Sequence, residues 1–164
     1  MTIHEEFHQA GLTHGHYCPG LAIGVRAAVE GRNAVGNGDD SICCIVERSA
    51  CWLDGMLQIG ATMGNGKLKI RDTGKAAFSF YNTANGKSVR LVLKPGPGGM
   101  NREESIQWLL TAPLDEVFAL GEVKVPFPEY LPGPRDVTCT VCGEQVLETH
   151  AHVKDGQFVC CDCL

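Results

Sequence analysis

The chain has 164 residues, of which 44% are hydrophobic and 20% charged, with a mean hydropathy of −0.04. This composition is typical of a soluble globular protein and excludes a largely disordered one. No apolar run approaches the roughly 20 residues that a membrane-spanning helix needs. The N-terminal sequence also lacks the basic and apolar regions of a secretory signal. We therefore expect a cytoplasmic protein with no membrane partner.

Most of the negative charge lies at the C-terminal end. Residues 136–164 contain one basic residue, Lys154, against five acidic residues, a net charge of −4, so only −1 of the chain's −5 falls on residues 1–135. Binding to nucleic acid needs clustered Lys and Arg side chains that displace phosphate counterions. We therefore expect no nucleic-acid partner.

The first segment carries a helix start signal. Thr2 and Glu5 have the spacing of a capping box, in which each side chain bonds the other residue's backbone N–H. This pattern predicts a short helix over residues 3–10, which Gly11 would end.

A second helix is predicted from residue 19 to about residue 31. Pro19 suits the first helical position, which makes Cys18 the N-cap. Gly20 and Gly24 lie one turn apart on this helix. They indicate either another element packed very close to this face or simply a crowded core.

The middle of the chain mixes strands and helices. Residues 42–47, ICCIVE, predict a buried strand, whose cysteines we interpret as core residues, and Ser49 can cap a buried helix over residues 50–60. Three β-rich segments separated by turn sequences then predict an antiparallel meander; they are residues 67–72, 75–82 and 87–94. Two short helices follow, over residues 102–110 and 114–120. The expected fold is therefore an α+β core domain over residues 1–125, followed by a Pro-rich linker over residues 126–135 and a small module over residues 136–164.

The C-terminal module carries two Cys-x2-Cys pairs, Cys139 with Cys142 and Cys160 with Cys163, separated by 17 residues. Such pairs form two knuckles whose four sulfurs converge on one Zn²⁺ ion, with no open position. Iron also suits four thiolates. The segment is too short to bury a core of its own, so the metal would supply folding energy.

The shape of this module is predicted from its turn. Residues 145–153 and 157–159 can pair about a Lys-Asp-Gly turn, which gives a zinc ribbon or a curtailed treble clef. We interpret Cys161, inside the second pair, as a spare cysteine. His150 and His152 point to the same side of a strand and are either further ligands or contacts, or plain surface histidines.

A second site is predicted in the core domain. Cys18 and Cys51 both fall at expected helix N-termini, which favour the thiolate. His16 and His14 precede Cys18 by two and four residues, and Asp54 follows Cys51 by one turn. We expect His16, Cys18, Cys51 and Asp54 to form either a metal site or a catalytic Cys–His site, with Asp54 as an outer ligand or an orienting group. A metal here would have at most three strong ligands and an open position; the alternative is that both cysteines are ordinary core residues.

Four stretches of the chain resemble the FmdE family, which takes its name from formylmethanofuran dehydrogenase. They are GHYCPGLAIGVRAA, VERSACWLDGMLQIG, GNGKLKIRDTGKAAFSFYN and VRLVLKP. The resemblance implies an α+β core that associates as a homodimer and carries a zinc module. It also implies a link to the subunits of molybdenum or tungsten formylmethanofuran dehydrogenase, which reduces CO2 onto methanofuran.

The same resemblance assigns the family's motif residues to positions in this chain. The family's GHxCPG motif places its histidine and cysteine at His16 and Cys18, the next motif supplies Cys51 and Asp54, and a later one places Lys75 near the sheet. The chain departs from the family pattern T-G-C-T-x-G-K-G, where Ala61 replaces the cysteine and Asn65 the lysine. If that cysteine is a ligand or redox partner in relatives, the chemistry here is changed.

Three functions fit these observations. The first is a metal-binding accessory of a molybdenum- or tungsten-dependent dehydrogenase, or a related enzyme, with Zn²⁺ in the C-terminal module and a second metal ion in the core. The second is an interaction scaffold without catalysis. The third is a thiol redox protein that uses Cys18 and Cys51. Two metal ions per chain would favour the first function and one the second, whereas the third needs a metal-free cysteine of low pKa.

Overall fold

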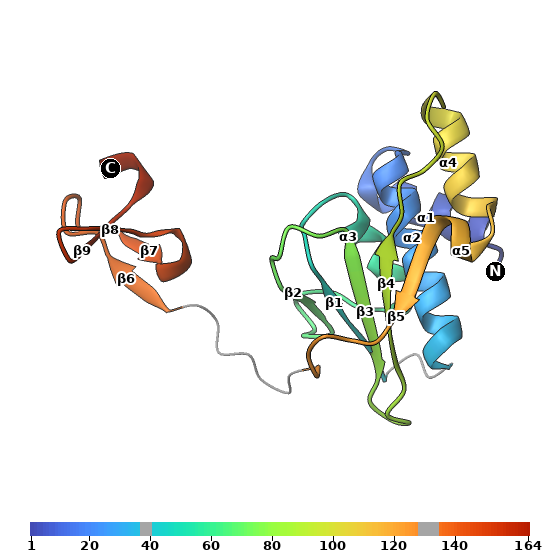
Figure 1. Cartoon of the computed structure of the whole chain (residues 1–164), viewed down its shortest axis with the longest axis horizontal. Coiled ribbons are helices and arrows are strands. Elements are labelled where there is room, and N and C mark those ends of the chain that lie inside the picture. The colour runs from blue at the N-terminus through green and yellow to red at the C-terminus, as the bar shows by residue number, and fades with distance from the viewer. Residues whose placement is uncertain (37–40, 128–134) are drawn as a thin grey trace. The chain divides into compact units, whose positions relative to one another are not determined.

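The computed structural model describes residues 1–36, 41–127 and 135–164. The chain divides into two compact units, Met1–Phe127 and Pro128–Leu164 (Figure 1). Most of the predicted linker lies outside the described residues. The first unit combines helices with a mostly antiparallel sheet, and the second contains two short hairpins and two 3-10 helices, η2 (Glu148–His150) and η3 (Cys161–Cys163), so the predicted α+β class is confirmed. Within the described ranges, no helix is both long enough and apolar enough to cross a membrane.

Helix α1 (Ile3–His14) begins with the predicted capping box and ends at Gly15, whose φ of 87° suits a left-handed helix cap. The prediction that Gly11 ends this helix was wrong. A Cβ atom on Gly11 would lie 2.0 Å from the ring of Tyr17, so glycine serves here to admit that ring rather than to end the helix.

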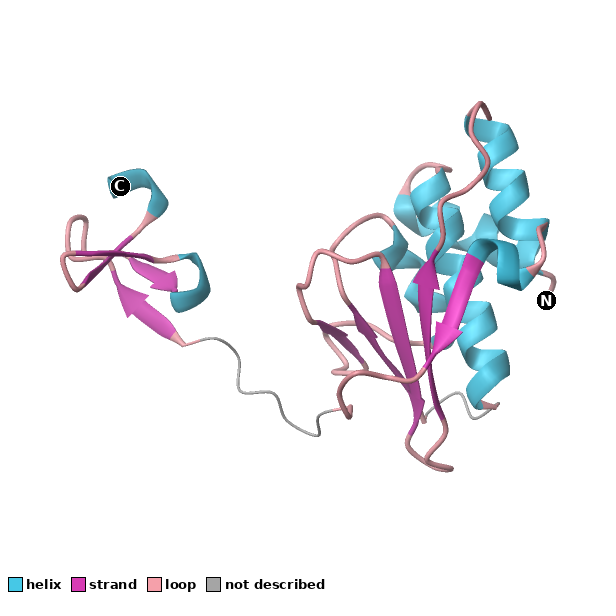
Figure 2. Ribbon diagram, in the orientation of Figure 1, coloured by secondary structure: helices cyan, strands magenta, loops and turns pink. Residues whose placement is uncertain are grey.

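Helix α2 (Pro19–Val35) is the central helix of the first unit. Cys18 caps it and Pro19 occupies its first turn, as predicted. The helix runs past Gly31 because this glycine gives space to the ring of Phe80, which a Cβ atom would approach to 2.4 Å. Helix α2 packs against β3 and β4 and is flanked by α1, α3 and α4 (Figure 2).

The sheet of the first unit has the order β2-β1-β3-β4-β5. Its strands are β1 (Ile42–Val46), β2 (Leu68–Ile70), β3 (Ala77–Asn82), β4 (Ser88–Leu93) and β5 (Phe118–Gly121). The predicted strand β1 and the antiparallel β3–β4 hairpin are present. The prediction for β2 was wrong, because it pairs with β1 in parallel rather than extending a meander.

Strand β5 takes up the last three residues of the segment 114–120, which was predicted to be helical throughout. Only α5 (Leu114–Val117) forms there, and the chain then extends to pair with β4. Pairing satisfies the backbone groups of β4 that would otherwise face the sheet edge, and it buries Phe118, which is 1% exposed and contacts Phe78 edge-to-face. Tertiary pairing thus overrides the local helical pattern.

The remaining helices are short. The predicted buried helix over residues 50–60 is a four-residue helix α3 (Trp52–Gly55) followed by a 3-10 helix η1 (Met56–Ile59). The later helix α4 (Arg102–Thr111) has its own capping box, built by Asn101 and Glu104. Both α3 and α4 contact α2.

A buried ion pair joins β4 to the end of β1. Arg90 Nε donates to Glu47 Oε1 at 2.7 Å, and Thr73 Oγ1 donates to the other carboxylate oxygen at 2.7 Å. Burial by itself raises the pKa of Glu47, but the bonds from Arg90 and Thr73 outweigh it and hold this pKa below its ordinary value.

The second unit contains two separate hairpins. Strand β6 (Asp136–Thr138) pairs with β7 (Gln145–Leu147), and β8 (His152–Lys154) pairs with β9 (Gln157–Val159). The predicted turn lies between β8 and β9, where Gly156 has a φ of 77°. The expectation that residues 145–147 belong to the same hairpin was wrong, since they pair with the strand before the first cysteine knuckle.

Candidate metal centres

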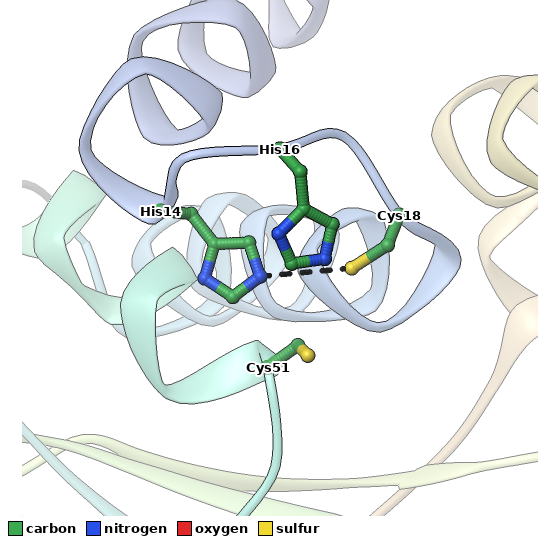
Figure 3. A group of neighbouring side chains, drawn as sticks. All are labelled: His14, His16, Cys18 and Cys51. Carbon is green, nitrogen blue, oxygen red and sulfur yellow. Dashed lines mark hydrogen bonds between the residues drawn. The ribbon is translucent and has the colours of Figure 1, made fainter.

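Four side chains with metal-binding atoms converge in the core domain. His14, His16, Cys18 and Cys51 each offer a nitrogen or sulfur atom, and these four atoms all lie within 4.8 Å of one another (Figure 3). The predicted members His16, Cys18 and Cys51 are thus close together. His14 makes a fourth donor where sequence reasoning expected at most three.

Cys18 is fixed by the start of α2. Its Sγ accepts a hydrogen bond from the backbone N–H of Leu21 at 3.3 Å, as an N-cap side chain does, and the residue is only 7% exposed. The same sulfur lies 3.8 Å from Nε2 of His14. Its orientation is therefore set by the backbone before any metal binds.

Cys51 differs from the prediction in its local environment. It makes no capping hydrogen bond, and the helix that follows it has only four residues, so a helix dipole does not stabilise its thiolate. Burial, then the hydrogen bond and charge of the adjacent Cys18, raise the pKa of Cys51. Two thiols this close resist ionising together, and a bound cation would remove that resistance.

The position of Cys51 depends on two close backbone contacts between α2 and α3. A Cβ atom on Gly24 would lie 2.2 Å from the carbonyl oxygen of Trp52, and one on Gly55 would lie 2.3 Å from the carbonyl carbon of Gly24. At Gly20 an added Cβ would lie 3.0 Å from Cβ of Cys51. Of the two explanations for the glycines on this face of α2, the structure shows the close approach of another element, and this approach brings the two cysteines together.

Asp54 positions a histidine and is not one of the four clustered residues. Its Oδ2 lies 2.6 Å from Nδ1 of His14, whose side chain is 10% exposed. A carboxylate on Nδ1 keeps the proton on that nitrogen and leaves Nε2 free as a lone-pair donor, a common arrangement behind metal-binding histidines. Of the two roles proposed for Asp54, the geometry matches the orienting one.

His14 was noted beside Cys18 in the sequence but was left out of the expected ligand set, because the end of α1 was placed too early. The extra turn of α1 carries His14 to the side of Cys18, four residues later. The signal that could have found it is the left-handed cap at Gly15, since a glycine there allows the helix to include His14.

The two departures from the family pattern fall outside the four-residue cluster. Ala61 is 1% exposed and lines a cavity of about 240 Å³ together with Asp54 and five other residues, none of them a clustered donor. Asn65 closes its own loop: its side-chain oxygen accepts from the N–H of Thr62, and its side-chain nitrogen donates to the carbonyl of Gly60 at 2.7 Å. The missing cysteine and lysine therefore remove none of the four donors. Lys75, carried over from the same family, is exposed just before β3.

The C-terminal unit gathers its four predicted cysteines. The sulfurs of Cys139, Cys142, Cys160 and Cys163 all lie within 4.8 Å of one another. Hydrogen bonds from the backbone N–H groups of Cys142 and Cys160 lower the pKa of Cys139 to about 6. The neighbouring thiol of Cys160, together with burial, raises the pKa of Cys163 to about 12. The same cluster thus lowers the pKa of one thiol and raises that of another, and a metal bound to both would need both as thiolates.

The other candidate residues stay outside both clusters. Cys161 is exposed, and so are His150 and His152. Cys43 and Cys44 lie buried in β1, and burial raises the pKa of both thiols. They are core residues, as predicted.

Comparison with known proteins relates this geometry to a family. The model of the family described as "FmdE, Molybdenum formylmethanofuran dehydrogenase operon" matches residues 13–119, more than half of the chain. A solved structure from Syntrophus aciditrophicus, described as a "tungsten formylmethanofuran dehydrogenase subunit e (fmde)-like protein", shares the fold with a TM-score of 0.61 and 23% identity. That match covers 98% of this chain and 91% of the other.

A protein of Archaeoglobus fulgidus, described as a probable S-adenosyl-L-methionine-binding protein, is 28% identical over 184 residues. The match covers 90% of this chain and 50% of that protein. The chain therefore spans about half the length of this curated relative.

Proposed function

The chain belongs to the FmdE family, and from this premise we propose that it is a metal-binding protein whose core domain holds a transition-metal ion of the zinc class. The observation that carries the proposal is the convergence of His14, His16, Cys18 and Cys51, with all four donor atoms within 4.8 Å of one another. Two imidazole nitrogens and two thiolates suit Zn²⁺ and other borderline metals. Two thiolates also balance the charge of a divalent ion.

The C-terminal unit would hold a second ion, Zn²⁺, through its four cysteines. Its buried cluster consists of Cys139, Val159 and Cys160, with Val146 and Cys163 packed against it. So small a core cannot offset the conformational entropy of ordering a segment of this size, so metal binding would supply much of its folding free energy. Four thiolates leave no open coordination position, which gives this ion a structural role.

The family description supports a more specific setting. We propose that the protein is an accessory of a molybdenum- or tungsten-dependent formylmethanofuran dehydrogenase system, because the matching family is described by that operon. Homodimer formation remains a prediction from the family resemblance. Light scattering on the purified protein would test it directly.

The two alternative functions make different demands on the core cysteines. A thiol redox protein needs an attacking cysteine of low pKa, whereas burial and the neighbouring Cys18 raise the pKa of Cys51. A scaffold without a core metal needs no polar cluster at this position. The arrangement of Asp54 behind His14 is instead typical of a metal ligand and its orienting carboxylate.

Elemental analysis of the full chain, purified without added metal, tests the proposal. We expect two metal ions per chain in the wild type and one in each of Cys51→Ser and Cys142→Ser. Cys161→Ser is the matched control, because Cys161 is exposed and outside both clusters, and it should retain two ions. A wild-type content of one ion that Cys51→Ser leaves unchanged would refute the core site and favour the scaffold function.

A further inference from the structure

We infer that His16 is the exchangeable ligand of the core metal, and that a small external anion takes its place while His14, Cys18 and Cys51 stay bound. This inference rests on the proposed function and deepens it. The reason is that three of the four donor side chains are held in place by the protein and that of His16 is not.

Three of the donors are held by contacts other than the metal. Asp54 fixes the ring of His14 through a 2.6 Å contact. The N–H of Leu21 fixes the sulfur of Cys18. Cys51 lies against Gly20 in the narrow space between α2 and α3. These side chains lose little further freedom when a metal binds, so each contributes most of its ligand strength to affinity.

His16 has no comparable support. It is exposed, and it lies in the connection between α1 and α2. Across the described part of the chain, no residue forms a hydrogen bond with its ring, which only contacts the ring of His14 at a centroid distance of 4.3 Å (Figure 3). The adjacent Gly15, at a φ of 87°, would meet nothing within 4 Å if it carried a Cβ atom. His16 must therefore be ordered by the metal alone, which makes it the weakest of the four ligands.

The surroundings of His16 favour an anion as its replacement. Arg102 donates through Nη2 to the carbonyl oxygen of Tyr17, the residue between His16 and Cys18, at 2.9 Å. This places a guanidinium beside the exposed connection. Among residues 1–36, 41–127 and 135–164, no carboxylate forms an ion pair with Arg102. The carboxylate of Asp54 is engaged with His14. An anion that replaces His16 would gain the attraction of both the metal and Arg102.

Cobalt(II) loading of the full chain provides a test that does not depend on any activity. Co²⁺ in the four-cysteine unit has no open position, so added azide should leave its absorption unchanged. We expect azide to shift the absorption bands of the core Co²⁺ in the wild type. In His16→Ala the core ion should be retained with about ten-fold weaker affinity, and azide should bind about ten-fold more tightly because it displaces no ligand. Arg102→Gln should weaken azide binding a few-fold without changing the metal content.

The comparison variant is His14→Ala, which should lose about 100-fold or more in core metal affinity. Cys51→Ser replaces it if thermal melting shows that His14→Ala is unfolded. Equal loss of the core ion in His16→Ala and in the comparison variant would overturn the inference. Azide shifts that occur only in His16→Ala would also overturn it, because the wild-type ligand would then not exchange. Uptake of a single Co²⁺ by the wild type would overturn the proposed function as well, whereas two ions with no azide response would overturn the inference alone.

Discussion

The substitution Gly24→Ala tests whether the backbone contact between α2 and α3 builds the core site. The new Cβ would lie 2.2 Å from the carbonyl oxygen of Trp52 and 2.6 Å from its Cα. Real contacts of this kind essentially never fall below 3.0 Å, so α3 has to retreat by about 1 Å. Cys51 directly precedes Trp52 and would move with it.

The expected change in the free energy of unfolding follows from two opposing effects. Overpacking against backbone costs about 3 kcal/mol, and the better helix propensity of alanine offsets about 1 kcal/mol of this. We therefore expect the free energy of unfolding to fall by about 2 kcal/mol, which corresponds to a melting temperature lower by roughly 6 °C. A displacement of about 1 Å also exceeds the roughly 0.2 Å tolerance of metal–ligand bonds, so core metal affinity should fall at least ~10-fold.

Thermal melting and metal analysis of the full chain measure both effects. Gly98→Ala is the matched control, because nothing lies within 4 Å of its added Cβ atom and its stability should stay the same or rise by about 0.5 kcal/mol. The reasoning would be refuted if Gly24→Ala raised stability by about 1 kcal/mol, as helix propensity alone demands, and kept both metal ions.

Three further predictions concern the carboxylates and the C-terminal cysteines. Asp54→Asn should weaken core metal binding about ten-fold, measured by competition with a chelator, because the carboxylate orients a ligand; a loss below two-fold would contradict this. The lowered pKa of Glu47 gives a stabilisation that is present above its ordinary value of about 4.3 and is lost as pH falls through its lower folded value. Glu47→Gln should accordingly destabilise the chain by about 3 kcal/mol at pH 7, because it leaves Arg90 buried without its partner, and urea unfolding should show this difference shrinking toward pH 3. Zinc uptake by the C-terminal unit at pH 7 should release close to four protons, because a unit that folds with its metal starts from cysteines near their ordinary pKa of about 8.5, as measured with a pH indicator on the Cys51→Ser variant; release of about three would show that the metal-free unit already holds the fold that lowers the pKa of Cys139 to about 6.

The sequence alone determined the features that depend on neighbouring residues. The capping box at Thr2, the Cys18 N-cap with Pro19 behind it, and the β3–β4 hairpin are all set by residues within a few positions of one another. The two C-terminal cysteine pairs belong to the same class, because each knuckle closes over two intervening residues. The family resemblance also came from contiguous motifs, and the match over residues 13–119 confirms it.

Only the tertiary structure decided where these local pieces meet. Gly11 and Gly31 look like helix ends in the sequence, but each lies inside a helix. The ring of Tyr17 fills the space where a side chain at Gly11 would lie, and the ring of Phe80 does the same at Gly31. Strand pairing at the sheet edges likewise placed β2 beside β1, and residues 118–121 formed a strand by pairing with β4. Because α1 continues past Gly11, it places His14 beside His16, Cys18 and Cys51. Propensity describes a segment on its own, whereas the free energy of burying a ring or pairing a strand edge depends on residues far away in the sequence.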